Sequence, residues 1–294
     1  MAKYIINDAF LGHVERLQML IKNNLAGQFG GNRKSRNYGS SCEFADYRDY
    51  MPGDDIMRID WNAYARFDKL YQKLYYDERQ MHTRIYIDAS RSMDYGKGAK
   101  AEQALKFAAT IAYLSVCEMD KVSMYVIRGD KLEEVFTGIV GKDAFYSVIA
   151  KLNEIEFDGD CRISDAVIPS NVGRGDGLSV ILSDFLTDND YENAINHLTD
   201  KRRDILCVQI LSREEMKPLL RGKMFLFDSE TVNKTYKRNI DKEIIQAYKK
   251  ALEYTVDRIK NHCVARGAEY MLIKAEEPIG NVFFEKMVDA GVLK

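Results

Sequence analysis

The sequence predicts an α/β protein built on a mostly parallel sheet with helices on both of its faces. From about residue 84 onward, short apolar runs typical of buried strands alternate with longer segments whose apolar residues recur every three or four positions. Parallel strands need crossover connections, which intervening helices supply. The chain has 294 residues, 46% of them hydrophobic, which is enough for one large domain or two modest ones with a substantial core.

Two regions are expected. Residues 1–80 comprise a helix over about 4–24, a loop over 27–41 rich in Gly, Ser, Asn and Arg, and a dense block of motif residues. The loop is either a solvated connector or a functional basic segment. Residues 81–294 form the α/β domain with a C-terminal hairpin and helix. In it we expect strands over 84–88, 121–127, 177–185, 204–211 and 269–273, helices over 99–117, 144–152, 191–198, 240–265 and 282–287, a strand over 132–136 that pairs back onto 121–127, and an added hairpin over 224–227 and 231–236.

Composition excludes several classes of protein. The 43 Lys and Arg nearly balance the 45 Asp and Glu, so a broad basic face for nucleic acid is not expected. No apolar run approaches the roughly 18–20 residues of a membrane span, and the first residues lack the apolar core of a signal peptide. The five cysteines form no CxxC pair. We therefore expect a soluble, cytoplasmic protein.

Oxygen-bearing side chains follow two of the predicted strands. Asp88, Ser90 and Ser92 occupy alternate positions after one strand, and Asp184 ends another. In parallel sheets, ligands bind at the carboxyl ends of the strands. Carboxylate and hydroxyl oxygens suit a hard divalent cation. The alternative is local: the serines cap the next helix and Asp88 accepts backbone donors.

Signals of catalysis are absent from the sequence. It contains no phosphate-binding GxxxxGK[ST] loop, no GxGxxG and no GxSxG nucleophile elbow. Asp88 at a strand end is compatible with the nucleophile of a metal-dependent phosphohydrolase. That chemistry usually needs a second acid two residues on, where this chain has Ser90. A non-enzymatic binding module is therefore the main hypothesis and the phosphohydrolase is the alternative.

The pattern Asp-x-Ser-x-Ser after a first strand, with Ser-Asp after a later one, resembles a von Willebrand factor A domain with its metal-ion-dependent adhesion site. A second set of residues is more specific. Its main block consists of Glu43-Phe44, Arg48-Asp49-Tyr50-Met51-Pro52-Gly53-Asp54-Asp55, Arg58-Ile59-Asp60-Trp61 and Ala65-Arg66. This signature block resembles that of the bacterial domain-of-unknown-function family fifty-eight. Further positions that fit the family are Ser92-Met93, Gly96, Asp120-Lys121-Val122 and Asp228-Ser229-Glu230.

This resemblance implies a protein–protein interaction module linked to a MoxR-type AAA+ ATPase, acting in client assembly or remodelling. It further implies a divalent ion, Mg²⁺ with Mn²⁺ or Ca²⁺ as alternatives, held by Asp88, Ser90, Ser92 and Asp184, with an open position for a partner's acidic residue. The domain usually supplies a Thr hydroxyl as well, and by register that place falls on Cys161. A thiol is a poor ligand for a hard ion. A scaffold with a vestigial metal site is therefore a third hypothesis.

The signature block also has an interpretation from its residues alone. Pro52-Gly53 is a turn pair. We expect a structural clasp that ties the N-terminal region to the sheet, rather than a direct partner surface. In this clasp, arginines bridge carboxylates in a buried network and the single Trp packs against the sheet. The residues concerned are Arg48, Arg58, Arg66, Asp54, Asp55 and Trp61.

Overall fold

A computed structural model of the chain describes residues 6–28, 44–75, 80–95, 99–173, 177–186, 191–220, 222–227 and 235–283. The chain divides into two compact units. We call Met1–Ile21 with Met81–Leu293 the α/β unit, and Lys22–Gln80 the signature unit. The division falls at residue 80, but it assigns most of the first helix, up to Ile21, to the α/β unit. The expected basic loop lies outside the described residues.

The α/β unit contains a six-stranded sheet in the order β10-β7-β6-β3-β4-β5. Every neighbouring pair is parallel except β4 and β5, which are antiparallel. The predicted mostly parallel sheet and the pairing of the 132–136 segment with the preceding strand are therefore confirmed. The strands are β3 (His82–Asp88), β4 (Lys121–Arg128), β5 (Lys131–Ile139), β6 (Leu178–Ser183), β7 (Asp204–Leu211) and β10 (Glu269–Lys274).

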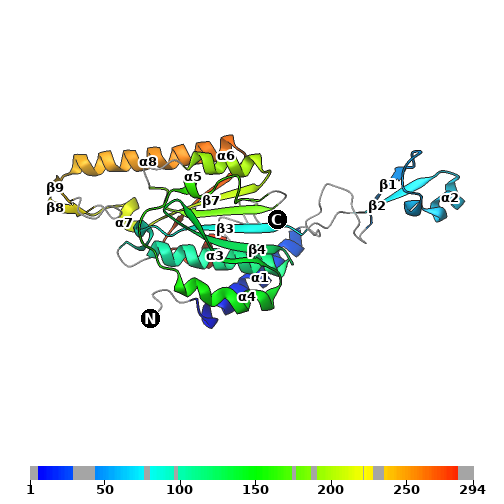
Figure 1. The fold of residues 1–294 in the computed structure, drawn as a ribbon, viewed down its shortest axis with the longest axis horizontal. Coiled ribbons are helices and arrows are strands. Elements are labelled where there is room, and N and C mark those ends of the chain that lie inside the picture. The colour runs from blue at the N-terminus through cyan, green and yellow to red at the C-terminus, as the bar shows by residue number, and fades with distance from the viewer. Residues whose placement is uncertain are drawn as a thin grey trace. The chain divides into compact units, whose positions relative to one another are not determined.

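Helices cover both faces of this sheet, as predicted (Figure 1). One face carries α1 (Asp8–Gln28), α3 (Ala99–Cys117) and α4 (Lys142–Val148), and the other carries α5 (Ile163–Ala166), α6 (Glu192–Asp200) and α8 (Lys242–Ala265). Short helical elements complete the unit: α7 (Arg213–Met216), α9 (Ile279–Asn281) and the 3-10 turns η2 (Arg91–Asp94) and η3 (Ile149–Glu154). The helix expected over 144–152 is thus α4 followed by a 3-10 turn.

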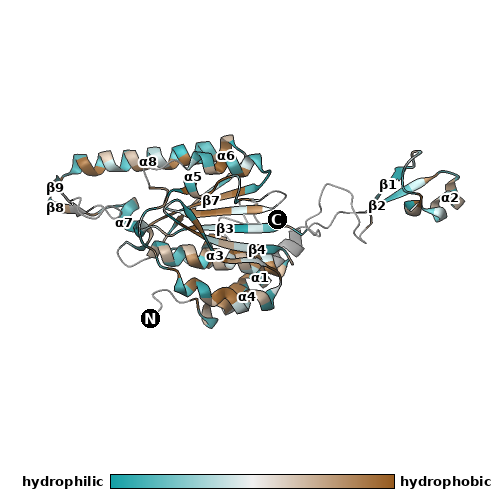
Figure 2. Cartoon of the chain, in the orientation of Figure 1, coloured by the Kyte–Doolittle hydropathy of each residue, from teal (hydrophilic) through white to brown (hydrophobic). Residues whose placement is uncertain are grey.

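The core lies on both faces of the central strands. In β3, Ile85, Tyr86 and Ile87 are each 0% exposed. Successive side chains of a strand point to opposite faces of the sheet, and helices cover both faces. Figure 2 shows the same contrast, with largely hydrophobic central strands and many hydrophilic residues along α8. Within the described ranges, no helix is both long and apolar enough to cross a membrane.

One arginine joins the amino ends of three strands. Arg203, which directly precedes β7, is 6% exposed. It donates to the Leu178 carbonyl at 2.7 Å, to Ser179 Oγ at 3.0 Å and to the His82 carbonyl. A Cβ at Gly177 would lie 2.5 Å from the His82 carbonyl oxygen and 2.8 Å from the guanidinium, so glycine is needed for this close approach. Gly177 also has a positive φ of 143°, which residues with a side chain rarely adopt.

At its C-terminal end the α/β unit carries an added hairpin, β8 (Gly222–Phe227) paired antiparallel with β9 (Thr235–Ile240). The second strand begins four residues later than expected. The Asp228-Ser229-Glu230 motif lies outside the described residues. The expected final helix over 282–287 would start directly after α9, and all but its first two residues also lie outside the described residues.

The signature unit contains elements that the sequence reading did not predict. Strands β1 (Phe44–Asp49) and β2 (Tyr71–Tyr75) pair antiparallel, and η1 (Ile56–Arg58) and α2 (Trp61–Phe67) lie between them in sequence. Asp60 is the N-cap of α2, and the Tyr47 hydroxyl donates to its Oδ2 at 2.7 Å. That hydrogen bond, opposed by desolvation and supported by the Ala63 amide, lowers the pKa of Asp60 to about 2.

One expectation for this unit was wrong, because its arginine–carboxylate pairs lie on the surface of the unit. Trp61 is 58% exposed and lies edge-on to Tyr64, and its packing against the sheet of the α/β unit stays a prediction. The Arg48–Asp54 ion pair, at 2.7 Å, is on the surface, with the Arg48 side chain 51% exposed. Arg58 lies 3.7 Å from Asp55, and both of these side chains are also substantially exposed. These pairs therefore do not form a buried network.

Candidate functional site

The predicted oxygen ligands converge at the carboxyl edge of the sheet. Asp88 is the last residue of β3, and Asp184 directly follows β6. These two strands are parallel neighbours, with Ile87 opposite Leu182, so their ends meet at one edge. Ser90 and Ser92 lie in the loop and 3-10 turn after β3. Asp88, Ser90 and Asp184 are each 2% exposed.

A chain of hydrogen bonds joins these side chains. Ser90 Oγ lies 3.0 Å from Ser92 Oγ, and Ser92 Oγ donates to Asp184 Oδ2 at 2.9 Å. Asp88 Oδ1 accepts the Ser90 amide at 2.8 Å, and its Oδ2 accepts Ser183 Oγ at 2.5 Å. The structure thus brings together the four side chains and adds Ser183, which sequence reasoning missed although it stands beside Asp184 in the motif.

Burial and a second carboxylate make Asp88 a strongly perturbed acid. Burial raises the pKa of Asp88, and the nearby negative charge of Asp184 raises it further. Hydrogen bonds from Ser183 and Ser90 act in the opposite direction. Since a buried carboxylate is costly without compensating positive charge, this environment favours a cation close to the two acids.

The backbone after β6 turns sharply to present Asp184. Phe185 has φ of 50°, an uncommon value for a bulky residue. Its amide donates to Ser183 Oγ at 2.9 Å, and the Leu186 amide donates to Asp184 Oδ1 at 3.0 Å. Gln209 of β7 donates to the Asp184 carbonyl at 2.7 Å. The turn is therefore held by polar contacts on both sides of the acid, and the Phe185 ring is 1% exposed.

A lysine that the sequence reading did not single out also belongs to this cluster. Lys100, in the first turn of α3, is 3% exposed. Its Nζ lies 2.7 Å from Asp184 Oδ2 and 2.5 Å from Glu215 Oε1. The carboxylates outweigh desolvation, so the pKa of Lys100 is raised and the ammonium is charged. One signal was available for Glu215, because Ser212-x-x-Glu215 is a capping-box spacing.

Cys161 lies in a different environment. It is 1% exposed and belongs to the apolar cluster that includes Tyr86, Ile163 and Phe185. Its loop does contact the motif, because the Asp158 amide donates to the Ala89 carbonyl at 2.9 Å and the Arg91 amide donates to the Gly159 carbonyl at 3.0 Å. The loop is therefore placed beside the motif, as the resemblance implies, while the thiol itself is enclosed by apolar side chains.

The donor set fits a hard divalent cation through its mixture of carboxylates and hydroxyls. In the described part of the chain there is no group of three or more His, Cys, Asp or Glu side chains arranged for a metal. The predicted set, with two carboxylates and two serines, is of a different kind from the His and Cys sets that hold zinc. Lys100 already contacts one of those carboxylates and supplies part of the positive charge.

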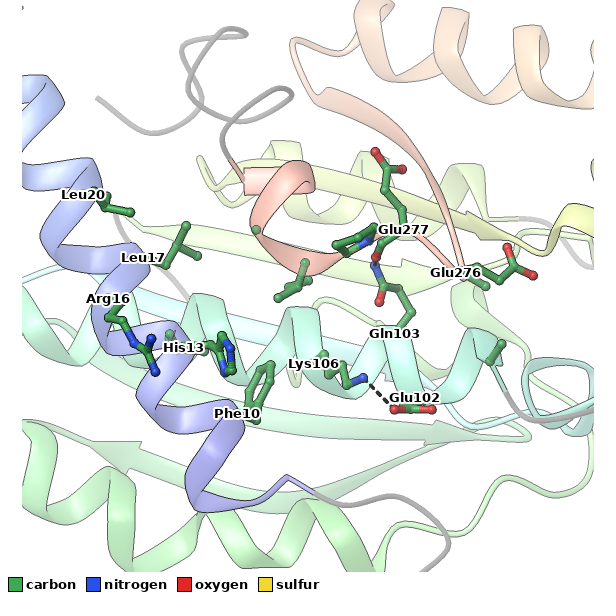
Figure 3. Close-up of a pocket in the computed structure, with 16 residues that line it drawn as sticks. Phe10, His13, Arg16, Leu17, Leu20, Glu102, Gln103, Lys106, Glu276 and Glu277 are labelled. Atoms are coloured by element: carbon green, nitrogen blue, oxygen red, sulfur yellow. Dashed lines mark hydrogen bonds and ion pairs between the residues drawn. The ribbon is translucent and has the colours of Figure 1, made fainter.

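A separate groove of about 680 Å³ lies between α1, α3 and the segment after β10. Figure 3 shows Phe10, Leu17 and Leu20 of α1 facing this space, which is lined mainly by apolar groups. Glu102 and Lys106, which both line the groove, form an ion pair at 2.6 Å along α3. The groove contains none of the four predicted ligands, so we treat it as distinct from the strand-end site.

A mostly parallel sheet between two helical layers, with Asp-x-Ser-x-Ser and Ser-Asp at the ends of adjacent central strands, defines a von Willebrand factor A-like domain. The model of the family described as "Protein of unknown function DUF58" matches residues 46–256. The chain belongs to this family, which confirms the family suggested by its sequence. The match begins in the signature unit and extends into α8, so it spans both units.

The chain is also similar to mycobacterial proteins and, more distantly, to solved structures. The uncharacterized proteins Rv1480 of Mycobacterium tuberculosis and Mb1516 of Mycobacterium bovis are each 25% identical over 222 residues, which is 73% of this chain and 69% of theirs. The SpRpn10 VWA domain matches with 11% identity and a TM-score of 0.38, covering 71% of this chain and 95% of its own. The pilus adhesin SpaC of Lactobacillus rhamnosus GG matches with 9% identity and a TM-score of 0.45, covering 72% of this chain and 30% of its own.

Proposed function

We propose that this protein is a non-enzymatic, cytoplasmic interaction module that captures an acidic residue of a partner protein at the strand-end site. The proposed ligands of a divalent ion, Mg²⁺ or alternatively Mn²⁺ or Ca²⁺, are Asp88, Ser90, Ser92 and Asp184. When bound, such an ion would act as a Lewis acid that accepts a carboxylate oxygen. The observation that carries the proposal is the continuous set of hydrogen bonds joining these side chains at the carboxyl edge.

Each side chain has a distinct part in this proposal. Ser90 and Ser92 offer neutral hydroxyl oxygens, which leave a bound cation poorly neutralised and able to accept an acid from another molecule. Asp88 and Asp184 provide the negative charge behind them. The Ser90 amide and Ser183 Oγ donate to Asp88, and the Leu186 amide donates to Asp184. Cys161 is outside the proposed set, since a thiol among apolar side chains is poorly suited to a hard ion.

The phosphohydrolase alternative is not favoured by the geometry. A nucleophilic carboxylate needs an oxygen accessible to substrate. Asp88 is 2% exposed, and each of its oxygens already accepts a hydrogen bond. Ser90, rather than a second acid, stands two residues further on. We therefore propose binding, not group transfer, as the task of the site.

The family resemblance supports a MoxR-type AAA+ ATPase as the first partner to test, with the module acting as its adaptor to a client. The test is calorimetric titration of the full chain with the MoxR-type ATPase of the same organism, with and without Mg²⁺, all without nucleotide. We expect Ser92→Ala to weaken Mg²⁺-dependent binding by at least tenfold, about 1.4 kcal/mol. Asp158→Ala, which changes an exposed carboxylate in the neighbouring loop, is the matched control and should bind normally.

The outcomes separate the two parts of this proposal. Equal affinity in Mg²⁺ and in EDTA, with Ser92→Ala unchanged, would exclude a metal bridge but leave the adaptor role. Absence of any binding to the ATPase would exclude that partner, and a titration against acidic client peptides would then test the site itself.

A further inference from the structure

Lys100 is buried in the middle of the strand-end site, where a positive charge needs partners to be stable. Its side chain is 4% exposed and that of Asp184 is 3% exposed. The Glu215 side chain, at 21%, is the most accessible of the three, so the line Asp184–Lys100–Glu215 runs from the interior toward solvent. The ammonium is thus enclosed between two acids that come from different elements.

Lys100 and the proposed ligand Ser92 share one acceptor oxygen. Asp184 Oδ2 accepts Ser92 Oγ at 2.9 Å and Lys100 Nζ at 2.7 Å. A divalent ion drawing on this same carboxylate would lie close to the ammonium and be repelled by it. The geometry therefore makes the two cations alternatives for the negative charge of Asp184.

Glu215 holds the ammonium through a carboxylate that is itself fixed. Its Oε2 accepts the Ser212 amide at 2.7 Å, while its own amide donates to Ser212 Oγ at 3.2 Å. These reciprocal contacts form the capping box of α7. The remaining oxygen, Oε1, faces Lys100. The acid that holds the lysine is therefore anchored to the start of a helix rather than free to swing.

From these contacts we propose that Lys100 is the resident cation of the strand-end site, that a divalent ion must compete with it for Asp184, and that Glu215 keeps it there. The inference rests on the proposed function, because it concerns the same ligand set. The site is then closed by its own chain when no partner is bound. Removal of the ammonium opens Asp184 to metal.

The experiment is titration of the full, metal-free chain with Mn²⁺, which is followed by calorimetry and by the electron paramagnetic resonance signal of free Mn²⁺. We expect Lys100→Met to raise the affinity at least about tenfold, because a like charge beside the ion is removed while the volume is kept. Lys100→Arg keeps the charge and should show no gain. Lys106→Met is the matched control on the same helix, since Lys106 pairs with Glu102 instead of the site.

The proposal is overturned if wild type binds Mn²⁺ through the site, as shown by loss of binding in Asp184→Asn, yet Lys100→Met binds no more tightly. That result would leave the proposed function intact. Absence of Mn²⁺ binding in both wild type and Lys100→Met would overturn the proposed metal site and this inference together. Circular dichroism in EDTA checks folding. Should Lys100→Met not fold, Lys100→Gln, which keeps a donor without the charge, takes its place with the same expected gain.

Discussion

The strand-end site and the signature unit place polar and apolar groups in opposite ways. At the ends of β3 and β6, carboxylates and an ammonium are almost completely buried, with Asp184 2% exposed. In the signature unit, large apolar side chains face outward, with Met57 93% and Phe67 65% exposed. Buried charge is stable only where a large scaffold supplies partners, whereas a two-stranded ribbon with one short helix has too little interior to enclose its own apolar groups.

This contrast suggests a different energetic role for each region. Removal of a charged side chain from the strand-end site leaves its partner buried with fewer compensating charges, so the free energy of unfolding should fall. An aromatic ring of the signature unit is already largely exposed to water, so its removal should change the free energy of unfolding little. Its removal should instead weaken binding of any partner that contacts this surface. Three measurements, in order of expected size, test the contrast.

The largest effect is expected for Asp184→Ala. Lys100 is buried and pairs with both Asp184 and Glu215, so this variant removes one of the two carboxylates that contact its ammonium. Breaking a buried ion pair by removal of one member typically costs about 3–5 kcal/mol, and we expect a loss of that order in the free energy of unfolding. Urea denaturation in EDTA measures it. Asp158→Ala, with a 75% exposed carboxylate, should change stability by less than about 0.5 kcal/mol. Similar losses in the two variants would contradict the contrast.

The second effect is a fall in the stability of the α/β unit at acidic pH, which we attribute to His82. Burial, with the charges of Arg84, Arg203 and Lys121 adding to it, lowers the pKa of His82 from 6.5 to about 4. The unfolded chain therefore takes up this proton first, so the stabilisation is complete above pH 6.5 and is lost as pH falls from 6.5 to about 4. We expect a loss on the order of 1–2 kcal/mol after solvent screening.

Urea midpoints between pH 7 and pH 4 measure this loss. In wild type, His82 Nε2 lies 2.8 Å from Ser123 Oγ. His82→Gln keeps a polar group near that hydroxyl and removes the titration. Its stability should fall less steeply than that of wild type across this window. Parallel pH profiles for the two proteins would show that His82 is not the group responsible.

The smallest effect is expected for Trp61→Ala in the signature unit. Since the ring is already 58% exposed, the free energy of unfolding should change by less than about 1 kcal/mol. Thermal and urea unfolding of the full chain measure the change. A loss of about 3 kcal/mol or more, typical of a buried Trp, would instead support the clasp that the sequence suggested. An unchanged stability with weaker ATPase binding would support a partner surface.

The architecture was predictable from the sequence because buried strands and amphipathic helices have different periods. The convergence of Asp88 and Asp184 followed from topology, since the carboxyl ends of adjacent parallel strands share an edge. Neither prediction required knowledge of side-chain packing. For the same reason, the bounds of β7 and α3 agree with the expected ranges at both ends.

The parts that could not be predicted depend on contacts between distant residues. Lys100 and Glu215 are separated by 115 positions, and a lysine at the start of a helix is ordinarily solvated. The strands of the signature unit were missed because β1, with the sequence FADYRD, lacks an alternating apolar pattern. The position of Cys161 among apolar side chains likewise depends on how its loop enters the core.

The guanidinium of Arg203 has a further consequence for how the sheet can change shape. It connects the beginnings of β3 and β6 through the His82 and Leu178 carbonyls, at the edge opposite Asp88 and Asp184. The far edge is therefore cross-linked, whereas the edge that holds Asp88 and Asp184 continues into loops and short helical turns. If a ligand binds at those loops as proposed, we expect strand register to be unchanged, because the strand starts are held by Arg203.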